Sequence, residues 1–294
     1  MRVTVTGASG LIGKQLVERL RARGDDVTTL SRNPSTPGAV AWQPEDEPAP
    51  VAALAGRDSV VHLASENVGQ RWSDDVKRRI RSSRELGTRN LVAGIEAADP
   101  RPRVLVSPSA VGYYGAHGDE RLDEQTTPGS GFLAEVCVIW EREALRAAEL
   151  GLRVVTLRTG IVLDQSGGAL AKMLPFFKLG VGGPVAGGGQ YMPWIHVDDV
   201  VGLYLAALDG DAWEGPVNAS APEPVTNKVF SKALGRALHR PAFAPVPGLA
   251  VRTLYGEMAE IVTKGQRAVP RRAQALGYAF AYPDLDEAVN AALA

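Results

Sequence analysis

The chain has one cysteine, Cys137, among 294 residues, and its formal net charge at pH 7 is −1. A single cysteine excludes an intramolecular disulfide and a cysteine-rich metal site. A net charge near zero provides no basic field for nucleic acid or for an anionic membrane surface. No apolar run reaches the ~18 residues of a spanning helix, and a strand pattern follows Met1 without a charged and then apolar leader. We therefore expect a cytoplasmic protein with a small-molecule partner and no metal ion.

A glycine-rich turn, TGASGLIG over residues 6–13, follows a short apolar run and opens a helical pattern. In such a unit Gly7 suits the tight turn, Gly10 the close approach of a phosphate, and Gly13 the packing of helix on strand. Backbone N–H groups and the positive end of the helix dipole then face a pyrophosphate. The strand before the glycines and the helix after them indicate a dinucleotide site rather than an ordinary tight turn.

A second strand pattern, over residues 27–30, ends at Ser31 and Arg32. Folds that prefer NAD place an acidic residue here, about 20 positions beyond the glycines, where it binds the ribose 2′-hydroxyl. A guanidinium and a hydroxyl can instead bind a 2′-phosphate, which a carboxylate would repel. The pair therefore favours NADP(H) over NAD, and the alternative is an arginine that is merely solvated at a strand end.

Strand and helix patterns alternate as far as residue 160, which predicts a parallel sheet with helices on both faces. The fold class is α/β, a Rossmann-like doubly wound sheet with a smaller, mainly helical carboxyl-terminal substrate lobe. We assign residues 1–165 and about 194–220 to the cofactor-binding domain, 166–193 to a glycine-rich lid or substrate wall, and 221–294 to the helical lobe. In detail, residues 266–276 are predicted to be helical, and Asp198 is expected to cap a helix rather than bind a metal.

Polar side chains follow two of the predicted strands at their carboxyl ends, where ligands of such sheets bind. Leu63, Ala64 and Glu66 follow the strand at residues 59–63 and should lie near the cofactor, whereas His62 is expected in the core. The strand at residues 104–107 leads into SPSAVGYYG, which is the best candidate for chemistry. Its hydroxyl groups belong to Ser109, Tyr113 and Tyr114.

Five segments in this order, TGASGLIG, HLAS, SPSAVGYYG, LRTGIVL and WIHVDD, resemble the extended short-chain dehydrogenase/reductase superfamily. Longer segments, such as ASENVGQRW, FLAEVCVIWE and GPVNASAPEPVTNKVF, are similar to its atypical, epimerase-like group, which ends in a characteristic helical domain. The resemblance covers essentially the whole chain. The oligomeric state stays open between monomer and homodimer. The helices at residues 73–98 and 132–150 correspond to those that pair in many relatives.

The resemblance implies a role for each matching residue. The pyrophosphate would be held by Gly7, Ser9, Gly10, Leu11, Ile12 and Gly13, and the 2′-phosphate by Ser31 and Arg32. Further cofactor contacts would come from Leu63, Ala64, Ser107, Leu157, Arg158 and Thr159, and from Arg84, which replaces the asparagine of an NxxGT pattern. Ser109 matches the active-site serine or threonine. The candidate residues for substrate binding, which belong to no specific motif, are Glu66, Lys172 and Arg267.

One departure concerns the YxxxK pair of the superfamily, in which a tyrosine transfers a proton while a lysine lowers the tyrosine pKa and holds the nicotinamide ribose. Here Leu133 stands where the tyrosine belongs and Cys137 where the lysine belongs. Leucine has no proton to give, and a thiol on an apolar helix face is a poor electrostatic substitute for an ammonium group. The usual mechanism is therefore in question.

Three functions follow as hypotheses. The chain is an NADP(H)-dependent oxidoreductase in which Tyr113 or Tyr114, beside Ser109, donates a proton to a carbonyl substrate. Alternatively it is a sugar-nucleotide epimerase, which retains and reoxidises its cofactor. The third hypothesis is a non-catalytic protein that binds or senses NADP(H), for which loss of the YxxxK pair with retention of the binding residues is the expected pattern.

Overall fold

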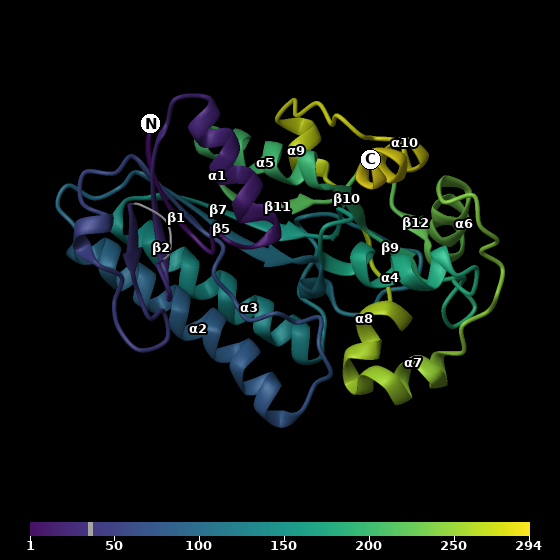
Figure 1. The fold of residues 1–294 in the computed structure, drawn as a ribbon. Coiled ribbons are helices and arrows are strands. Elements are labelled where there is room, and N and C mark those ends of the chain that lie inside the picture. Colours follow the sequence, from purple (N-terminus) through teal and green to yellow (C-terminus); the bar gives the residue numbers. More distant parts are fainter. Residues whose placement is uncertain (35–37) are drawn as a thin grey trace.

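A seven-stranded parallel sheet forms the centre of the computed structural model, which describes residues 1–34 and 38–294 (Figure 1). The strand order is β11-β7-β5-β4-β1-β2-β3, and every neighbouring pair is parallel. The predicted Rossmann-like α/β class is thereby confirmed. The strands of this sheet are β1 (Arg2–Thr6), β2 (Asp26–Ser31), β3 (Ala39–Ala41), β4 (Ser59–His62), β5 (Val104–Ala110), β7 (Arg153–Thr159) and β11 (Gly215–Ala219).

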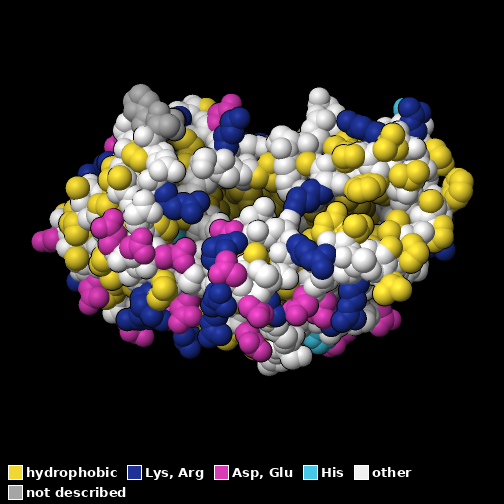
Figure 2. Space-filling view, turned by 60° about the horizontal axis from the view of Figure 1, so that its bottom comes forward, with side chains coloured by type: hydrophobic (Ala, Val, Ile, Leu, Met, Phe, Trp, Pro, Cys, Tyr) yellow, Lys and Arg dark blue, Asp and Glu magenta, His cyan; other side chains and the backbone are white. Residues whose placement is uncertain are grey.

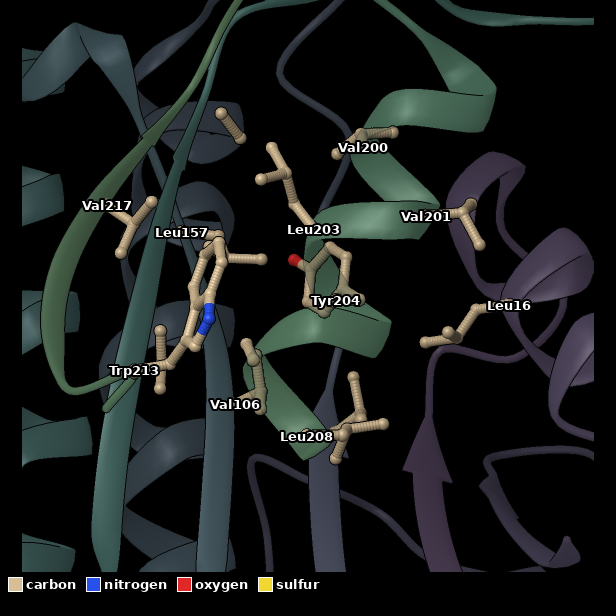
Figure 3. Packing of buried hydrophobic residues seen from close by; sticks show 14 of the residues in the cluster. Leu16, Val106, Leu157, Val200, Val201, Leu203, Tyr204, Leu208, Trp213 and Val217 are labelled. Carbon is tan, nitrogen blue, oxygen red and sulfur yellow. The ribbon is translucent and has the colours of Figure 1, made fainter. Parts of the chain in front are cut away.

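Two pairs of helices cover the sheet, one pair on each face (Figure 1). On one side lie α1 (Leu11–Ala22) and α5 (Val197–Asp209), and on the other α2 (Asp74–Ala97) and α3 (Phe132–Leu145). Figure 3 shows the core beneath α5, where Tyr204 points toward Trp213 and Leu157. Along α1 and α2 apolar residues recur every three or four positions, so each of these helices buries one stripe against the sheet and leaves a polar face in water.

A smaller lobe packs at one end of the sheet. Its core joins α4 (Gly168–Lys178), α6 (Asn227–Ala237) and α10 (Leu285–Leu293). Other short elements are α7 (Gly248–Tyr255), α8 (Glu260–Thr263), α9 (Arg271–Ala275), β6 (Arg121–Leu122), β8 (Ile161–Leu163), β9 (Tyr191–Met192), β10 (Trp194–His196), β12 (Val225–Thr226) and β13 (Arg267–Ala268). Four 3₁₀ turns complete the assignment: η1 (Val51–Ala53), η2 (Val111–Tyr114), η3 (Arg146–Leu150) and η4 (Gly256–Ala259).

Two predicted elements were wrong. The glycine-rich runs within residues 166–193 predicted a loop, but this segment contains α4, whose Leu170, Leu174 and Phe177 are buried in the core of the small lobe. Residues 266–276 are not one helix, because β13 pairs with β6 before α9 begins. In the first case the glycines that flank α4 outweighed its helical spacing, and in the second a long-range strand pairing replaces the start of the predicted helix.

The start of α5 also differs from the prediction. The cap is His196, whose Nδ1 accepts the backbone N–H of Asp198, and Asp198 itself pairs with Arg19. The carboxylate of Asp199 accepts the backbone N–H groups of Ala281 and Tyr282 and so ties the carboxyl-terminal segment to α5. Across residues 1–34 and 38–294, no three His, Cys, Asp or Glu side chains gather as metal ligands. No helix in that part of the chain is long and apolar enough to cross a membrane.

His62 lies in the core as predicted, fully buried between the first strand and α2. The Thr6 hydroxyl accepts the backbone N–H groups of Leu63 and Ala64, so its own hydrogen is directed to His62 Nδ1 at 2.8 Å. The other ring nitrogen, Nε2, lies 3.2 Å from the Thr88 hydroxyl. This network joins the strand ends of β1 and β4 directly below the glycine turn.

The burial of His62 predicts an acid-sensitive stability. Full burial lowers the pKa of His62 from 6.5 to about 4, so the folded chain keeps the ring neutral while the unfolded chain protonates it below pH 6.5. Unfolding therefore takes up a proton in this window, and stability is lost as the pH falls from 6.5 to about 4. We expect His62 to account for a loss of about 3 kcal/mol in the free energy of unfolding. Urea titrations at several pH values in this range give the free energy of unfolding as a function of pH. This free energy should fall more steeply with decreasing pH for the unaltered protein than for His62→Gln, and an equal pH dependence of the two would contradict the assignment.

Candidate functional site

A cleft of about 850 Å³ opens at the carboxyl ends of β1, β2 and β4. It begins at the glycine turn and runs past the end of β2 to the segment after β4. Figure 2 shows that the molecule is hollowed between two lobes, with hydrophobic side chains gathered on the right-hand lobe. The predicted residues that line the cleft are Gly7, Ser9, Gly10, Ser31, Arg32, Leu63, Ala64 and Glu66.

Two glycines of the turn, Gly7 and Gly13, are sites that no larger residue fits. Gly7 has φ +66°, and a Cβ atom there would lie 2.5 Å from the carbonyl carbon of Leu63. At Gly13 a Cβ would lie 2.2 Å from the carbonyl oxygen of Gly7. Close packing of α1 on the strand ends therefore requires glycine at both positions, as predicted.

The amino terminus of α1 is free to receive an anion. Gly10 occupies the cap position without a side-chain hydrogen bond, and the first turn has no acidic residue. The contrast is α2, where the Ser73 hydroxyl accepts the N–H of Val76 and two aspartates occupy the first turn. The first N–H groups of a helix have no partner within it, so those of α1 are open to a phosphate. Beside them, Gly167 packs on Leu11 and brings the start of α4 against the turn.

Three cations line the cleft. Arg32 follows β2, while Lys14 and Arg21 project from α1 seven residues apart, two turns along the same face. In the described part of the chain none of the three forms an ion pair, although Glu18 and Glu45 also line the cleft. Sequence reasoning missed Lys14 and Arg21, and their heptad spacing behind the glycine turn is the signal that could have identified them.

A buried ionic network surrounds the carboxyl end of β5. Arg158 on β7 makes a bidentate pair with Glu141 on α3, with Nε–Oε1 and Nη2–Oε2 distances of 2.8 Å. The Ser109 hydroxyl donates to the same Glu141 at 2.6 Å. The Tyr114 hydroxyl accepts from Arg158 and donates to Asn218 at 2.7 Å.

This network decides which of the predicted hydroxyl groups has a hydrogen available for a substrate. Ser109 is 3% exposed and Tyr114 is fully buried, and burial raises the pKa of Tyr114 to about 12. Since each already donates its hydrogen to a buried acceptor, the placement does not favour either as a proton donor to substrate. Tyr113 differs: it is partly exposed, and the Arg158 guanidinium lies 3.5 Å from its ring centre. Glu141 was missed because nothing in its own helix indicates the partner on β7.

The other predicted nicotinamide contacts are mostly inside the core. Leu157 is fully buried, Arg158 is committed to Glu141, and the Ser107 hydroxyl is buried without a hydrogen-bond partner. Thr159 is partly exposed at the end of β7. None of these four residues lines the cleft, so their cofactor roles stay predictions.

Leu133 and Cys137 face the segment after β5. A Cβ on Gly112 would lie 3.4 Å from Leu133 Cβ and 3.9 Å from Cys137 Sγ. Burial raises the pKa of Cys137 to about 11, so the thiol stays protonated and uncharged at neutral pH. The two positions of the YxxxK pattern are therefore filled by groups that neither transfer a proton nor carry a charge.

Of the three predicted substrate anchors, Glu66 lines the cleft, whereas Lys172 and Arg267 do not. Lys172 on α4 donates through Nζ to the carbonyl oxygen of Gly69, three residues beyond Glu66. Arg267 on β13 lies over the Tyr191 ring and donates to the carbonyl oxygen of Asp119. The structure thus brings Lys172 and the Glu66 loop together and places Arg267 apart from them. Their roles stay predictions.

Comparison with known proteins matches two family models. The NAD dependent epimerase/dehydratase family matches residues 3–218, and a domain of unknown function (DUF1731) matches residues 246–292. An Arabidopsis thaliana protein named "Epimerase family protein SDR39U1 homolog, chloroplastic" is 41% identical, over 99% of this chain and 86% of that protein.

Two solved structures are also similar in sequence and fold. Human epimerase family protein SDR39U1 (isoform 2), crystallised with NADPH, is 35% identical, with a TM-score of 0.90 over 99% of this chain and 98% of that chain. The nucleoside-diphosphate sugar epimerase from Corynebacterium glutamicum is 35% identical, with a TM-score of 0.81 over 98% of this chain and 57% of that chain.

Proposed function

The chain belongs to the NAD dependent epimerase/dehydratase family, and on that basis we propose that it binds NADP(H) in the cleft that begins at the glycine turn. The carrying observation is the uncapped amino terminus of α1, whose N–H groups are open to a pyrophosphate. Among the unpaired cations that line the cleft, Arg32 after β2 suits a 2′-phosphate, and Lys14 and Arg21 on α1 add positive charge. The NADPH in the human relative supports the same assignment.

When bound, NADP(H) supplies hydride exchange with a carbonyl or hydroxyl carbon. We propose a small carbonyl, hydroxyl or sugar-nucleotide substrate, and an oxidoreductase or epimerase reaction without the YxxxK pair. The residues of the chain must then orient that substrate and move its proton. Tyr113 is the candidate proton donor, because it alone of the three predicted hydroxyl residues is partly exposed. Tyr113→Phe should abolish most turnover, and an unchanged rate would end this version.

A second candidate is a protein that binds NADP(H) without catalysis. It is favoured by the uncharged pair Leu133 and Cys137, and by the commitment of Ser109 and Tyr114 to buried partners. Both candidates share the cofactor site and differ in whether a substrate is converted there.

The cofactor assignment is tested at Arg32. A charge-assisted hydrogen bond contributes about 1.5–3 kcal/mol, so Arg32→Ala should weaken NADPH roughly 10- to 100-fold while leaving NADH unaffected. Isothermal titration with both dinucleotides measures this. The matched control is Arg78→Ala, an exposed arginine on α2 whose partner Asp75 lies outside the cleft. Equal losses for NADPH and NADH, or none for either, would refute the role of Arg32.

A further inference from the structure

Arg84 is a buried cation without a carboxylate partner. Arg84 and Arg158 are the two buried arginines in the described part of the chain, and they are 7% and 3% exposed. Arg158 pairs with Glu141, whereas no carboxylate in that part of the chain lies within ion-pair distance of Arg84. Its desolvation lowers the pKa to about 10. Since buried charges are costly unless paired, an unpaired guanidinium points to an anionic or polar ligand.

Backbone carbonyls hold Arg84 in place, and the Glu66 carboxylate acts on its charge from beyond ion-pair distance. Nη1 donates to the carbonyl oxygens of Glu66 at 3.1 Å and Ile80 at 3.0 Å. The guanidinium carbon lies 4.7 Å from the ring centre of Trp140, a cation–π contact between α2 and α3. The hydroxyl of Ser83 accepts the N–H of Glu66 and fixes the same loop. The group is therefore positioned beside the cleft, which Glu66 and Ser83 both line.

Arg84 also lies close to Cys137, the position at which the YxxxK pattern has its lysine. Trp140, on which it stacks, is three residues from Cys137 on α3. Arg84 and Cys137 are close enough for the guanidinium charge to act on the thiol, where it opposes the effect of burial on the Cys137 pKa. A cation thus reaches the region of the missing lysine from the neighbouring helix.

We infer that Arg84 supplies from α2 the positive charge that the lysine of a YxxxK pair supplies from α3, and that it holds the nicotinamide-side ribose and phosphate of NADP(H). This inference rests on the proposed cofactor site. It separates two binding regions: Arg32, Lys14 and Arg21 serve the adenosine half, and Arg84 serves the nicotinamide half. The affinity for a ligand that consists of the adenosine half alone should therefore not depend on Arg84.

The test compares NADPH with adenosine 2′,5′-bisphosphate, which lacks the nicotinamide half, by isothermal titration. Arg84→Gln should weaken NADPH roughly 10- to 100-fold and leave the bisphosphate unchanged, because only one of the ligands reaches the lost charge. Arg32→Ala should weaken both ligands. If Arg84→Gln changes neither affinity, or lowers both equally, the inference is wrong. If the unaltered protein binds neither ligand, the proposed cofactor site itself fails.

A rescue experiment distinguishes charge from structure. Arg84→Gln combined with Cys137→Lys returns a cation from α3 and should recover NADPH affinity, whereas Arg84→Gln with Cys137→Met should not. Equal affinity of the two double variants would overturn the inference. Arg84→Lys keeps the cation if Arg84→Gln does not fold, and it should retain NADPH binding that Arg84→Met loses; equal binding by these two would count against the inference. Thermal unfolding of every variant confirms that the compared proteins are folded.

Discussion

Replacing Glu141 by glutamine is expected to lower the free energy of unfolding by about 3–5 kcal/mol, the cost of breaking a buried ion pair. Glu141 and Arg158 are 7% and 3% exposed, so the guanidinium cannot turn to water when its partner loses its charge. Glutamine keeps the size of the side chain but offers one oxygen where Arg158 and Ser109 now share two. The loss therefore comes from an uncompensated charge and not from a cavity.

Urea unfolding followed by circular dichroism measures this difference. Glu135→Gln is the matched control, since Glu135 lies on the same helix but is exposed and should cost less than about 1 kcal/mol. Similar losses for the two variants would show that the buried pair has no special importance for stability.

Gly13→Ala is expected to weaken NADPH binding by roughly 100-fold or more, the equivalent of two lost charge-assisted hydrogen bonds. The added Cβ would lie 2.2 Å from the carbonyl oxygen of Gly7, so α1 must move away from the turn that holds the pyrophosphate. Such overpacking also destabilises the fold, typically by about 1–3 kcal/mol.

Isothermal titration, at a temperature where the variant is folded, measures the effect of Gly13→Ala. Gly118→Ala is the control, because a Cβ at Gly118 has no atom within 4 Å. NADPH affinity that survives Gly13→Ala unchanged would show that the turn does not hold the cofactor as proposed.

Sequence patterns predicted the main sheet because local and global signals agree there. Alternating strand and helix patterns, and the glycine turn between β1 and α1, are properties of short segments. The helix α4 was missed although Leu170, Leu174 and Phe177 follow helical spacing, because the glycine-rich runs on both sides of it suggested a loop. The pairing of β13 with β6 joins residues 146 positions apart and leaves no local trace.

The candidate site divides in the same way. The glycine turn and Ser31 lie at the ends of strands that the sequence itself indicates, so their position along the chain was enough to place them at the cleft. Ser109 and Tyr114 gave no sign that their hydroxyls are committed, because the partners come from α3, β7 and β11. Hydroxyl groups at a strand end identify a neighbourhood, and only the fold decides which of them face the ligand.

The uncapped amino terminus of α1 and the cation Arg32 together form the proposed NADP(H) site. Isothermal titration of the unaltered protein with NADPH and NADH tests it most directly. Because a 2′-phosphate bound by even one cation gains about 1.5–3 kcal/mol, we expect NADPH to bind at least about 10-fold more tightly than NADH. Equal affinities for the two, or no binding of either, would contradict the account.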